Sequence, residues 1–306
     1  MFKKQQYGFG GDVVYIVIGA NGFLGSYTLK SIVNRTEETV IATFHGKEEK
    51  LFPNRVEWTS LDITDVNSIK NLRSKVDDIA GCKIFYFSAC HNLDLVKREP
   101  EYARNINVTA LHNFLEAFKG AECLYFSSTD CVYGENTAEI PLYKESDPAT
   151  PVSEYGRQKL EAEALVTSYG FNAVRLPFMI GPSLLENKKH FYDNIVEKTV
   201  QGETFTLADG LWRSALDYSS VADILVTLSR KKNVPQILNL CGDNSLSKYD
   251  IGLLIAKKHN LPTEHLIKTP EAEIMKLFYE RRTSSTAMDN TLLKGILGVD
   301  EIKIKF

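Results

Sequence analysis

The sequence predicts an α/β protein in which a doubly wound parallel sheet is joined to a smaller α/β lobe toward the C-terminus. Three observations indicate this fold class. An unbroken apolar run at 13–18 leads into a glycine-rich turn and a helical pattern, strands and helices then alternate up to residue 129, and polar residues recur where the strands end. Such alternation favours parallel strands, because a parallel pair needs a crossover connection that is usually a helix.

The first strand and its turn form the most informative stretch. The run 13–18 has the length of a strand buried on both faces, and glycines follow it with the spacing G-x-x-G-x-x-G. Glycine permits a sharp turn, a close approach of the backbone to a pyrophosphate and tight helix packing, while the helix N-terminus attracts an anion. A tight turn without a ligand is the alternative. We expect a dinucleotide to contact Gly19, Asn21, Gly22, Phe23, Leu24 and Gly25.

Composition and charge exclude several classes of protein. The chain has 306 residues and a net charge of −3, which gives no reason to expect nucleic acid or an anionic membrane surface as a partner. No apolar run is long enough to span a membrane, and the polar stretch 1–12 is expected to be a loosely held tail rather than a signal peptide. The five cysteines form no C-x-x-C pair, which favours free thiols in a reducing cytoplasm over disulfides or a metal site.

The second strand, predicted at 39–44, bears on the choice of cofactor. Folds that prefer NAD tend to end this strand in Asp or Glu, which binds the adenosine ribose. Here no carboxylate follows until Glu48, whereas His45 and Lys47 are available for a 2′-phosphate. We therefore favour NADP(H), with NAD as the alternative; a basic solvated loop without this role is also open.

The next three strands place polar side chains at one edge of the sheet. The third, at 56–63, carries Asp62 and Ile63 at its tip, where we expect the adenine; Asp62 could instead cap the next helix. The fourth, at 83–88, leads through Ser88 and Ala89 into a loop of small residues over which the cofactor can lie. After a helix at 99–118, the fifth strand at 124–129 ends in Thr129. Ligands of such sheets bind beyond these carboxyl ends.

Tyr155 and Lys159 carry the predicted chemistry. They lie four residues apart on a helix expected at 153–168, so they share one helix face. A nearby ammonium should lower the pKa of the phenol, which could then exchange a proton with a substrate oxygen near neutral pH. The Thr129 hydroxyl could hold the same oxygen. Alternatively, a Y-x-x-x-K pair can simply lie on a solvent-exposed helix face. The order of the motifs along the chain favours a reductase.

These motifs together resemble those of the extended short-chain dehydrogenases/reductases, the NAD-dependent epimerase/dehydratase superfamily, over nearly the whole chain. The glycine turn and Asp62-Ile63 match the cofactor contacts of that family, and Asn107 matches its structural helix asparagine. Thr129, Tyr155 and Lys159 match its catalytic triad, of which the last two also contact the cofactor. The resemblance implies a Rossmann-type domain at 1–177 and 213–245 and a substrate lobe at 178–212 and 246–306.

Within this superfamily the chain is most similar to nucleotide-sugar 4-ketoreductases of the dTDP-4-dehydrorhamnose reductase type. The similarity lies in the stretches 93–100, 128–133 and 281–293, although the last lacks a proline usual in those reductases. It implies reduction of a 4-keto, 6-deoxy sugar nucleotide. Cys131 replaces a glutamate of the sugar 4,6-dehydratases, which disfavours dehydration. A 4-epimerase with bound NAD stays open, and a non-catalytic, dinucleotide-binding regulatory subunit is the alternative of another class.

After residue 182, within the predicted lobe, the sequence pattern is less regular. We expect helices at 191–201, 247–258 and 271–279, a helix capped by Ser220, and a last sheet strand at 237–240. Arg213 is the candidate for the substrate pyrophosphate, because a guanidinium suits bidentate phosphate binding; a surface arginine is the alternative. His91 is a candidate second proton donor, or simply a histidine in the cleft wall. The expected substrate contacts are His91, Thr129, Asp130 and Arg213, and a homodimer is one possible assembly.

Overall fold

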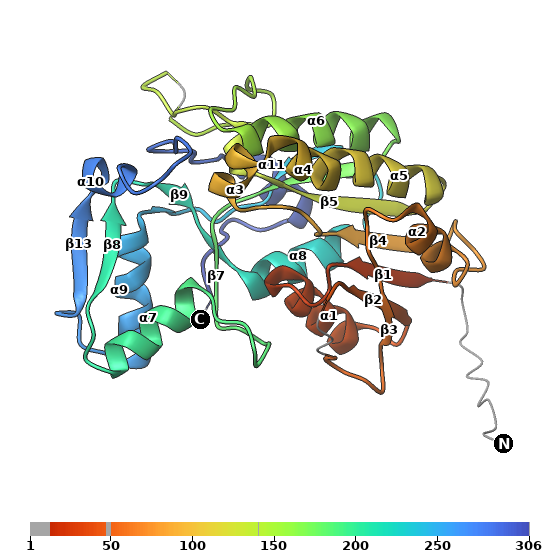
Figure 1. Ribbon diagram of the computed structural model, residues 1–306, viewed down its shortest axis with the longest axis horizontal. Coiled ribbons are helices and arrows are strands. Elements are labelled where there is room, and N and C mark those ends of the chain that lie inside the picture. The colour runs from red at the N-terminus through yellow and green to blue at the C-terminus, as the bar shows by residue number, and fades with distance from the viewer. Residues whose placement is uncertain (1–12, 47–49, 140, 306) are drawn as a thin grey trace.

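The computed structural model describes residues 13–46, 50–139 and 141–305. Its main sheet has seven strands in the order β11-β6-β5-β4-β1-β2-β3, and every pair in it is parallel (Figure 1). This confirms the predicted doubly wound sheet. The order reverses between β1 and β4, so ligands are expected at the carboxyl ends of these strands. The strands are β1 (Val14–Ile18), β2 (Thr39–Phe44), β3 (Glu57–Ser60), β4 (Cys82–Tyr86), β5 (Cys123–Thr129), β6 (Asn172–Leu176) and β11 (Ile237–Asn239).

Helices cover both faces of the sheet, because β1 alternates its side chains between two cores. Tyr15 and Val17 pack into one core with α1 and α8, whereas Ile16 and Ile18 pack into the other with α2, α5 and α6. No helix within the described ranges is long and apolar enough to cross a bilayer. The covering helices are α1 (Phe23–Arg35), α8 (Tyr218–Leu228) and α11 (Thr291–Leu297) on the first face, and α2 (Val66–Arg73), α5 (Ala110–Ala117) and α6 (Glu154–Ser168) on the second.

The connection between β4 and β5 differs from the single helix predicted there. It consists of α3 (Leu93–Arg98), α4 (Pro100–Arg104), a π-helical turn at Asn105–Thr109 and then α5. The π-turn carries Asn107, whose side chain donates to the Cys90 carbonyl at 3.0 Å and accepts from the Cys90 N–H at 2.8 Å. Asn107 also donates to Gln158 on α6 at 3.0 Å. This asparagine therefore ties the loop after β4 to the helix that carries Tyr155.

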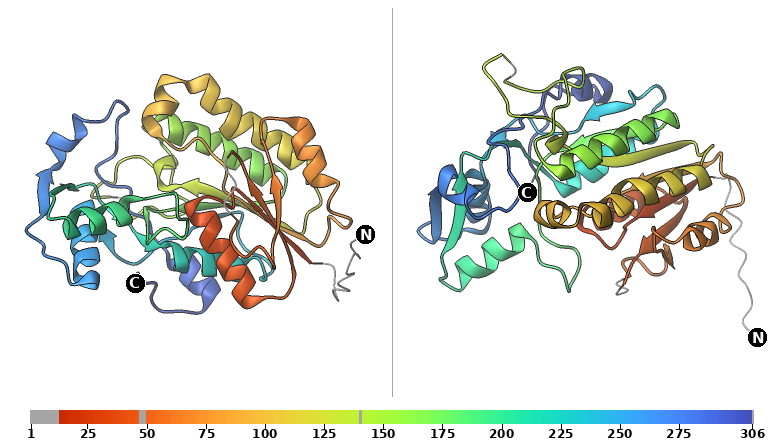
Figure 2. Two further views of the ribbon diagram at one scale, coloured as in Figure 1. Left: turned by 60° about the horizontal axis from the view of Figure 1, so that its bottom comes forward. Right: turned by 45° about the horizontal axis from the view of Figure 1, so that its top comes forward.

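The smaller lobe lies beside the sheet domain in both views of Figure 2. It has a core of its own, in which Ile195, Leu207, Ile251 and Ile255 are buried. Its parallel strands β8 and β13 pair directly, and the short strands β7 and β9 pair with β10 and β12. The remaining elements are β7 (Met179–Ile180), α7 (Phe191–Val200), β8 (Phe205–Asp209), β9 (Arg213–Ser214), β10 (Leu216–Asp217), β12 (Ser245–Leu246), α9 (Lys248–His259), β13 (Leu266–Pro270) and α10 (Glu271–Met275).

Three expectations about this half of the chain need correction. The cap of α8 is Asp217, whose carboxylate accepts from the Ser220 N–H at 2.8 Å, so Ser220 is not the cap. The helix expected at 271–279 ends at Met275. The lobe range 246–306 is too long, because α11 returns to the sheet and buries Leu293 in the core beside α1 and α8. Burial against the sheet, which residue spacing did not reveal, decides where this last helix belongs.

Candidate active site

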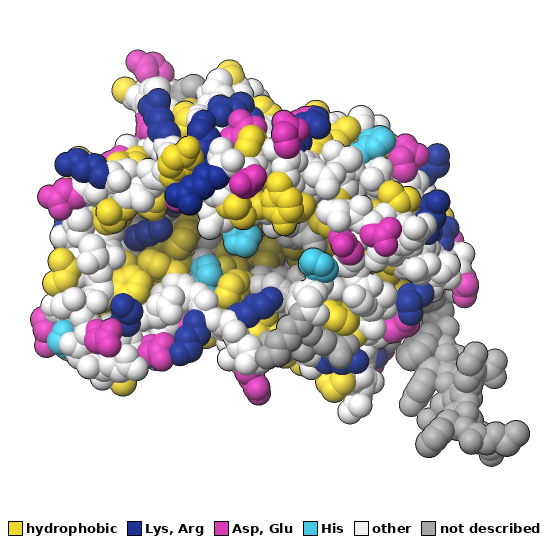
Figure 3. Space-filling view, in the orientation of Figure 1, with side chains coloured by type: hydrophobic (Ala, Val, Ile, Leu, Met, Phe, Trp, Pro, Cys, Tyr) yellow, Lys and Arg dark blue, Asp and Glu magenta, His cyan; other side chains and the backbone are white. Residues whose placement is uncertain are grey.

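A cavity of about 710 Å³ lies between the carboxyl ends of the strands and the lobe. Figure 3 shows this hollow, with hydrophobic side chains inside it and basic and histidine side chains around it. The sheet domain contributes the glycine turn, the loop after β4, the end of β5 and the start of α6, and the lobe contributes the opposite wall. The predicted site residues that line the cavity are Gly19, Gly22, Phe23, Leu24, Gly25, Ala89, His91, Thr129, Asp130, Tyr155, Lys159 and Arg213.

The glycine turn has the form expected of a phosphate cradle. Gly19 has φ +80°, a conformation that favours glycine, and its N–H donates to the Thr43 hydroxyl at 3.1 Å. A Cβ at Gly25 would overlap the carbonyl oxygen of Gly19, so α1 could not pack this closely on β1 with any other residue there. A Cβ at Gly22 would lie 3.2 Å from the same oxygen. These residues therefore fit a bound pyrophosphate.

The other expected cofactor residues lie outside the cavity lining. The Asn21 carbonyl accepts a hydrogen bond from Lys188 of the lobe, and Ser88 lies against Gly19 beneath the turn. The Asp62 carboxylate accepts from the side chain and backbone of Thr64, and these bonds lower its pKa. Asn21 and Ser88 therefore lie around the glycine turn, and Asp62 lies where we expect the adenine of the cofactor. Ile63 is partly buried against the core, His45 is exposed, and Lys47 falls outside the described residues.

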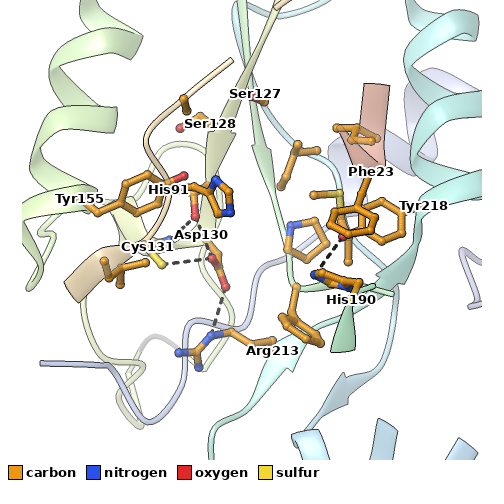
Figure 4. Close-up of a pocket in the computed structure, with 18 of the residues that line it drawn as sticks. Phe23, His91, Ser127, Ser128, Asp130, Cys131, Tyr155, His190, Arg213 and Tyr218 are labelled. Atoms are coloured by element: carbon orange, nitrogen blue, oxygen red, sulfur yellow. Dashed lines mark hydrogen bonds and ion pairs between the residues drawn. The ribbon is translucent and has the colours of Figure 1, made fainter. Parts of the chain in front are cut away.

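The start of α6 brings Tyr155 to the end of β5. The Ser153 hydroxyl caps this helix by accepting from the Gly156 N–H at 3.1 Å. A Cβ at Gly156 would overlap the carbonyl oxygen of Cys131, so the helix lies directly on the turn that follows Thr129. Figure 4 shows Tyr155 and His91 in the cavity lining, with Cys131 and Asp130 below them in this view. His91 is exposed and belongs to the lining.

The electrostatics of the Tyr155–Lys159 pair differ from the expectation. Lys159 is 2% exposed; its Nζ donates to the Ser127 carbonyl at 2.6 Å and lies 5.9 Å from the centroid of the Tyr155 ring. Burial lowers the pKa of Lys159 to about 7, against the opposing effect of Glu163. Burial also raises the pKa of Tyr155 above its usual range, as do Cys131 and Asp130. The predicted lowering of the tyrosine pKa is therefore wrong for this structure, because desolvation outweighs the attraction of the lysine.

Asp130 is held in a network rather than presented to a ligand. One carboxylate oxygen accepts from the Thr129 hydroxyl at 3.1 Å, and the other accepts from the Thr286 hydroxyl at 2.7 Å. The same second oxygen lies 3.3 Å from Nε of Arg213. Asp130 is 5% exposed, so its charge is compensated by the protein itself. Asp130 nevertheless lines the cavity, and its contact with the substrate stays a prediction.

Arg213 is likewise committed to protein partners. Besides Asp130, its guanidinium donates to the carbonyls of Trp212, Thr283 and Ser284 and to the Thr283 hydroxyl. These partners contact all three nitrogens of the guanidinium. Arg213 lines the cavity with these bonds in place, and its contact with a substrate phosphate stays a prediction. Its role in this structure is to tie the turn after β5 to the stretch 283–286.

The sequence analysis did not predict a buried hydrogen-bond network next to Lys159. Two guanidinium nitrogens of Arg175 donate to the carboxylate of Glu163 at 2.7 and 3.0 Å, and a third donates to the Tyr133 hydroxyl at 2.7 Å. The Ser128 hydroxyl also donates to Glu163. The spacing of Glu163, four residues after Lys159, was the available signal, since it puts both on one helix face. The missed lobe residues Lys188, His190, Lys248 and Arg282 also line the cavity, and no spacing in the sequence marked them.

Comparison with known proteins agrees with this geometry. The model of the NAD dependent epimerase/dehydratase family matches residues 15–241. Among curated relatives, methionine adenosyltransferase 2 subunit beta of Pongo abelii is 24% identical over 270 residues, which cover 85% of this chain and 76% of the relative. UDP-glucose 4-epimerase of Lacticaseibacillus casei is 29% identical over 170 residues, 53% of this chain and 50% of that protein.

Solved structures share the fold at low identity. The dTDP-4-dehydrorhamnose reductase of Bacillus anthracis, in complex with NADP, superposes with a TM-score of 0.76 at 17% identity and 95% coverage of both chains. The UDP-glucose 4-epimerase of Thermotoga maritima, with UDP-glucose, gives a TM-score of 0.78 at 20% identity and 94% coverage of both. The family match over most of the chain confirms the resemblance to extended short-chain dehydrogenases/reductases. The chain belongs to the NAD dependent epimerase/dehydratase family.

Proposed function

We propose that the protein is an NAD(P)-dependent oxidoreductase that reduces a 4-keto group on a nucleotide-linked sugar. One observation carries this proposal: Thr129, Tyr155 and Lys159 line the same cavity as the glycine turn. No group among the described residues is hydrogen-bonded to the Tyr155 hydroxyl, which leaves it available to a ligand. The similar structures named above, one with NADP and one with UDP-glucose, support this choice of cofactor and substrate class.

The chain's own residues have the protonation states that a reduction needs. A nicotinamide cofactor held at the glycine turn would supply the hydride. Tyr155 then donates its proton to the alkoxide that forms on the sugar. The Thr129 hydroxyl, which donates to Asp130 in the absence of a ligand, would turn to donate a hydrogen bond to the same oxygen. The raised pKa of Tyr155 keeps the phenol protonated at neutral pH, as a proton donor requires. Burial lowers the pKa of Lys159 to about 7, and its Nζ lies 5.9 Å from the centroid of the Tyr155 ring.

The same environment speaks against the neighbouring reactions of the family. A dehydratase needs an additional acid and base, but Asp130 is engaged by Arg213 and Thr286. Burial and the charge of Asp130 raise the pKa of Cys131 to about 12, so its thiol is a poor base at neutral pH. A 4-epimerase must first oxidise its substrate, which calls for a phenolate. The raised pKa of Tyr155 in the absence of a ligand suits the proton donor of a reduction, and the assay described below decides between reduction and epimerisation.

For the cofactor we propose NADP(H) ahead of NAD. The end of β2 carries no carboxylate for a ribose hydroxyl, and the exposed His45 can meet a 2′-phosphate. Fluorescence titration with NADPH and NADH measures the preference directly. His45→Ala should weaken the binding of NADPH more than the binding of NADH. Equal affinities for the two cofactors in both proteins would remove this preference.

The experiment for the main proposal is Tyr155→Phe, assayed for NAD(P)H oxidation with a panel of 4-keto sugar nucleotides. Loss of the positioned hydroxyl should lower kcat by about 10²–10⁴, with the fold and cofactor affinity retained. Tyr102→Phe is the matched control, because Tyr102 is 58% exposed on α4 and should leave kcat unchanged. A Tyr155→Phe variant that turns over substrate at the wild-type rate would mean that the proton comes from another group, and His91→Ala would be tested next.

A regulatory subunit is the second candidate function, and one observation favours it. Several curated relatives that cover most of this chain are methionine adenosyltransferase 2 beta subunits, at 24–25% identity. Light scattering of the protein mixed with a methionine adenosyltransferase from the same organism tests this alternative. A stoichiometric complex, together with inactivity toward every 4-keto sugar nucleotide, would replace the oxidoreductase assignment.

A further inference from the structure

The charges around the cavity are strongly unbalanced. Among the described residues that line it, there are three lysines and two arginines but a single carboxylate, Asp130. Lys188 lies at the glycine turn, where it donates to the Asn21 carbonyl, whereas Arg213, Lys248 and Arg282 belong to the lobe wall. A low-dielectric cavity with such an excess of cations is suited to anionic ligands at both ends.

Two of the three lobe cations already have a protein anion. Arg213 is paired with Asp130 at 3.3 Å, and its other donors are used by the stretch 283–284. Arg282 is paired with Asp94 of α3 at 3.1 Å and lies over the Phe278 ring. Each pair compensates the charge of its own cation. Neither arginine is therefore left with an uncompensated charge that would require a ligand.

Lys248 is the lobe cation without such compensation. It is the first residue of α9, and its Nζ lies 5.5 Å from the ring centroid of Phe178 and 5.8 Å from that of Phe191. No carboxylate of the described residues forms an ion pair with it. Burial lowers its pKa, and the neighbouring charges of Arg213 and Arg282 lower it further. The faces of the two rings attract the ammonium, but its burial beside two other cations is costly in the absence of an anion, and a bound anion lowers that cost.

We propose that Lys248 is the residue that anchors an oxyanion of the substrate, the role that the sequence suggested for Arg213. The proposal rests on the proposed function, since the ligand is taken to be a nucleoside diphosphate sugar. Such a ligand offers an oxyanion from its diphosphate or, in a uronic acid, from the sugar carboxylate. Both present the same chemistry to the ammonium of Lys248.

Calorimetric titration separates these cases without requiring turnover. The probes are UDP, dTDP, GDP, UDP-glucose and UDP-glucuronic acid, and the variant is Lys248→Met, which keeps the length of the side chain and removes the charge. We expect the dissociation constant to rise about 10- to 100-fold, as befits the loss of a charged hydrogen bond. Lys257→Met is the matched control on the exposed side of the same helix and should bind like the wild type. Lys248→Arg should restore most of the affinity.

Each outcome has a definite meaning. An equal loss for UDP-glucose and UDP-glucuronic acid places the diphosphate at Lys248, and a loss confined to UDP-glucuronic acid places the sugar carboxylate there. Unchanged affinity of Lys248→Met for every ligand that the wild type binds would overturn the role of Lys248 and leave the proposed function standing. A wild-type protein that binds NADPH but none of the five nucleotides would overturn both.

Discussion

The two walls of the cavity are built in different ways. The sheet wall, formed by the Gly19–Gly25 turn, Thr129, Tyr155 and Lys159, belongs to the ends of regular strands and helices. The lobe wall, formed by Arg213, Lys248 and Arg282, is assembled from segments that are joined by side-chain bonds across long distances in the sequence. Arg213 bonds to Thr283, and Arg282 bonds to Asp94. Sequence motifs identified the residues of the sheet wall. In the lobe wall the sequence does not tell whether a cationic side chain pairs with another protein segment or binds a ligand.

The largest effect we expect comes from breaking the cross-link of the lobe wall. Arg213→Met leaves Asp130, which is 5% exposed, without its cation, and should lower the free energy of unfolding by about 3–5 kcal/mol. Lys248→Met removes a cation that has no protein anion, so stability should be unchanged or higher. Urea unfolding of both variants compares the two roles. Equal losses of stability would mean that the lobe wall is not divided into a cross-link and a binding residue.

The sheet wall can be broken at its closest backbone contact. Gly25→Ala places a methyl group against the Gly19 carbonyl and should cost about 1–3 kcal/mol of stability, together with most of the dinucleotide affinity. The control is Gly295→Ala in α11, where a Cβ meets nothing within 4 Å; it should add about 0.5–1 kcal/mol through helix propensity. Thermal unfolding and NADPH titration give both numbers. A Gly25→Ala protein with wild-type cofactor affinity would refute the close packing of this turn.

The burial of Lys159 should appear in the pH dependence of stability. Its pKa is about 7 in the folded protein and about 10.5 in the unfolded chain, so between these values the unfolded state binds more protons. The free energy of unfolding should therefore rise with pH from Lys159, by up to about 1 kcal/mol per pH unit, and this contribution is lost as pH falls toward 7. Denaturant unfolding between about pH 7 and 8.5 measures the slope. Lys159→Met should show a smaller slope, and identical slopes would show that Lys159 is not desolvated.

The smallest effect is expected for an ion pair on α6 that lies outside both walls. Arg157 and Glu154 are 2.9 Å apart, but their side chains are 48% and 28% exposed. Arg157→Ala should change the free energy of unfolding by less than about 1 kcal/mol, because water screens an exposed pair. Glu163→Gln, on the same helix, removes the buried charge that pairs with Arg175. It should lower the free energy of unfolding several times more, and urea unfolding of both variants measures the two losses. Similar costs for the two variants would contradict the distinction between exposed and buried pairs.

Periodicity and turn chemistry alone predicted much of this molecule. The apolar run 13–18, the glycines after it and the Y-x-x-x-K spacing predicted β1, its turn and the shared face of Tyr155 and Lys159. These features depend on residues close together in the chain, so sequence patterns report them. The π-helical turn around Asn107 was not predicted, because residue spacing near 3.6 does not distinguish it from an ordinary helix.

The tertiary structure decided what depends on partners far along the chain. The sequence singled out Arg213 as a phosphate ligand and gave no reason to choose Lys248. In the structure, Asp130 and Thr283 bind Arg213, whereas Lys248 lies near the aromatic rings of Phe178 and Phe191. Burial likewise reversed the expected pKa of Tyr155 and lowered that of Lys159. Desolvation and charge pairing are properties of the packed environment, which no local pattern of residues encodes. The sequence thus determined the groups of the sheet wall, whereas only the fold brought the lobe cations to the cavity and decided which groups are free to meet a ligand.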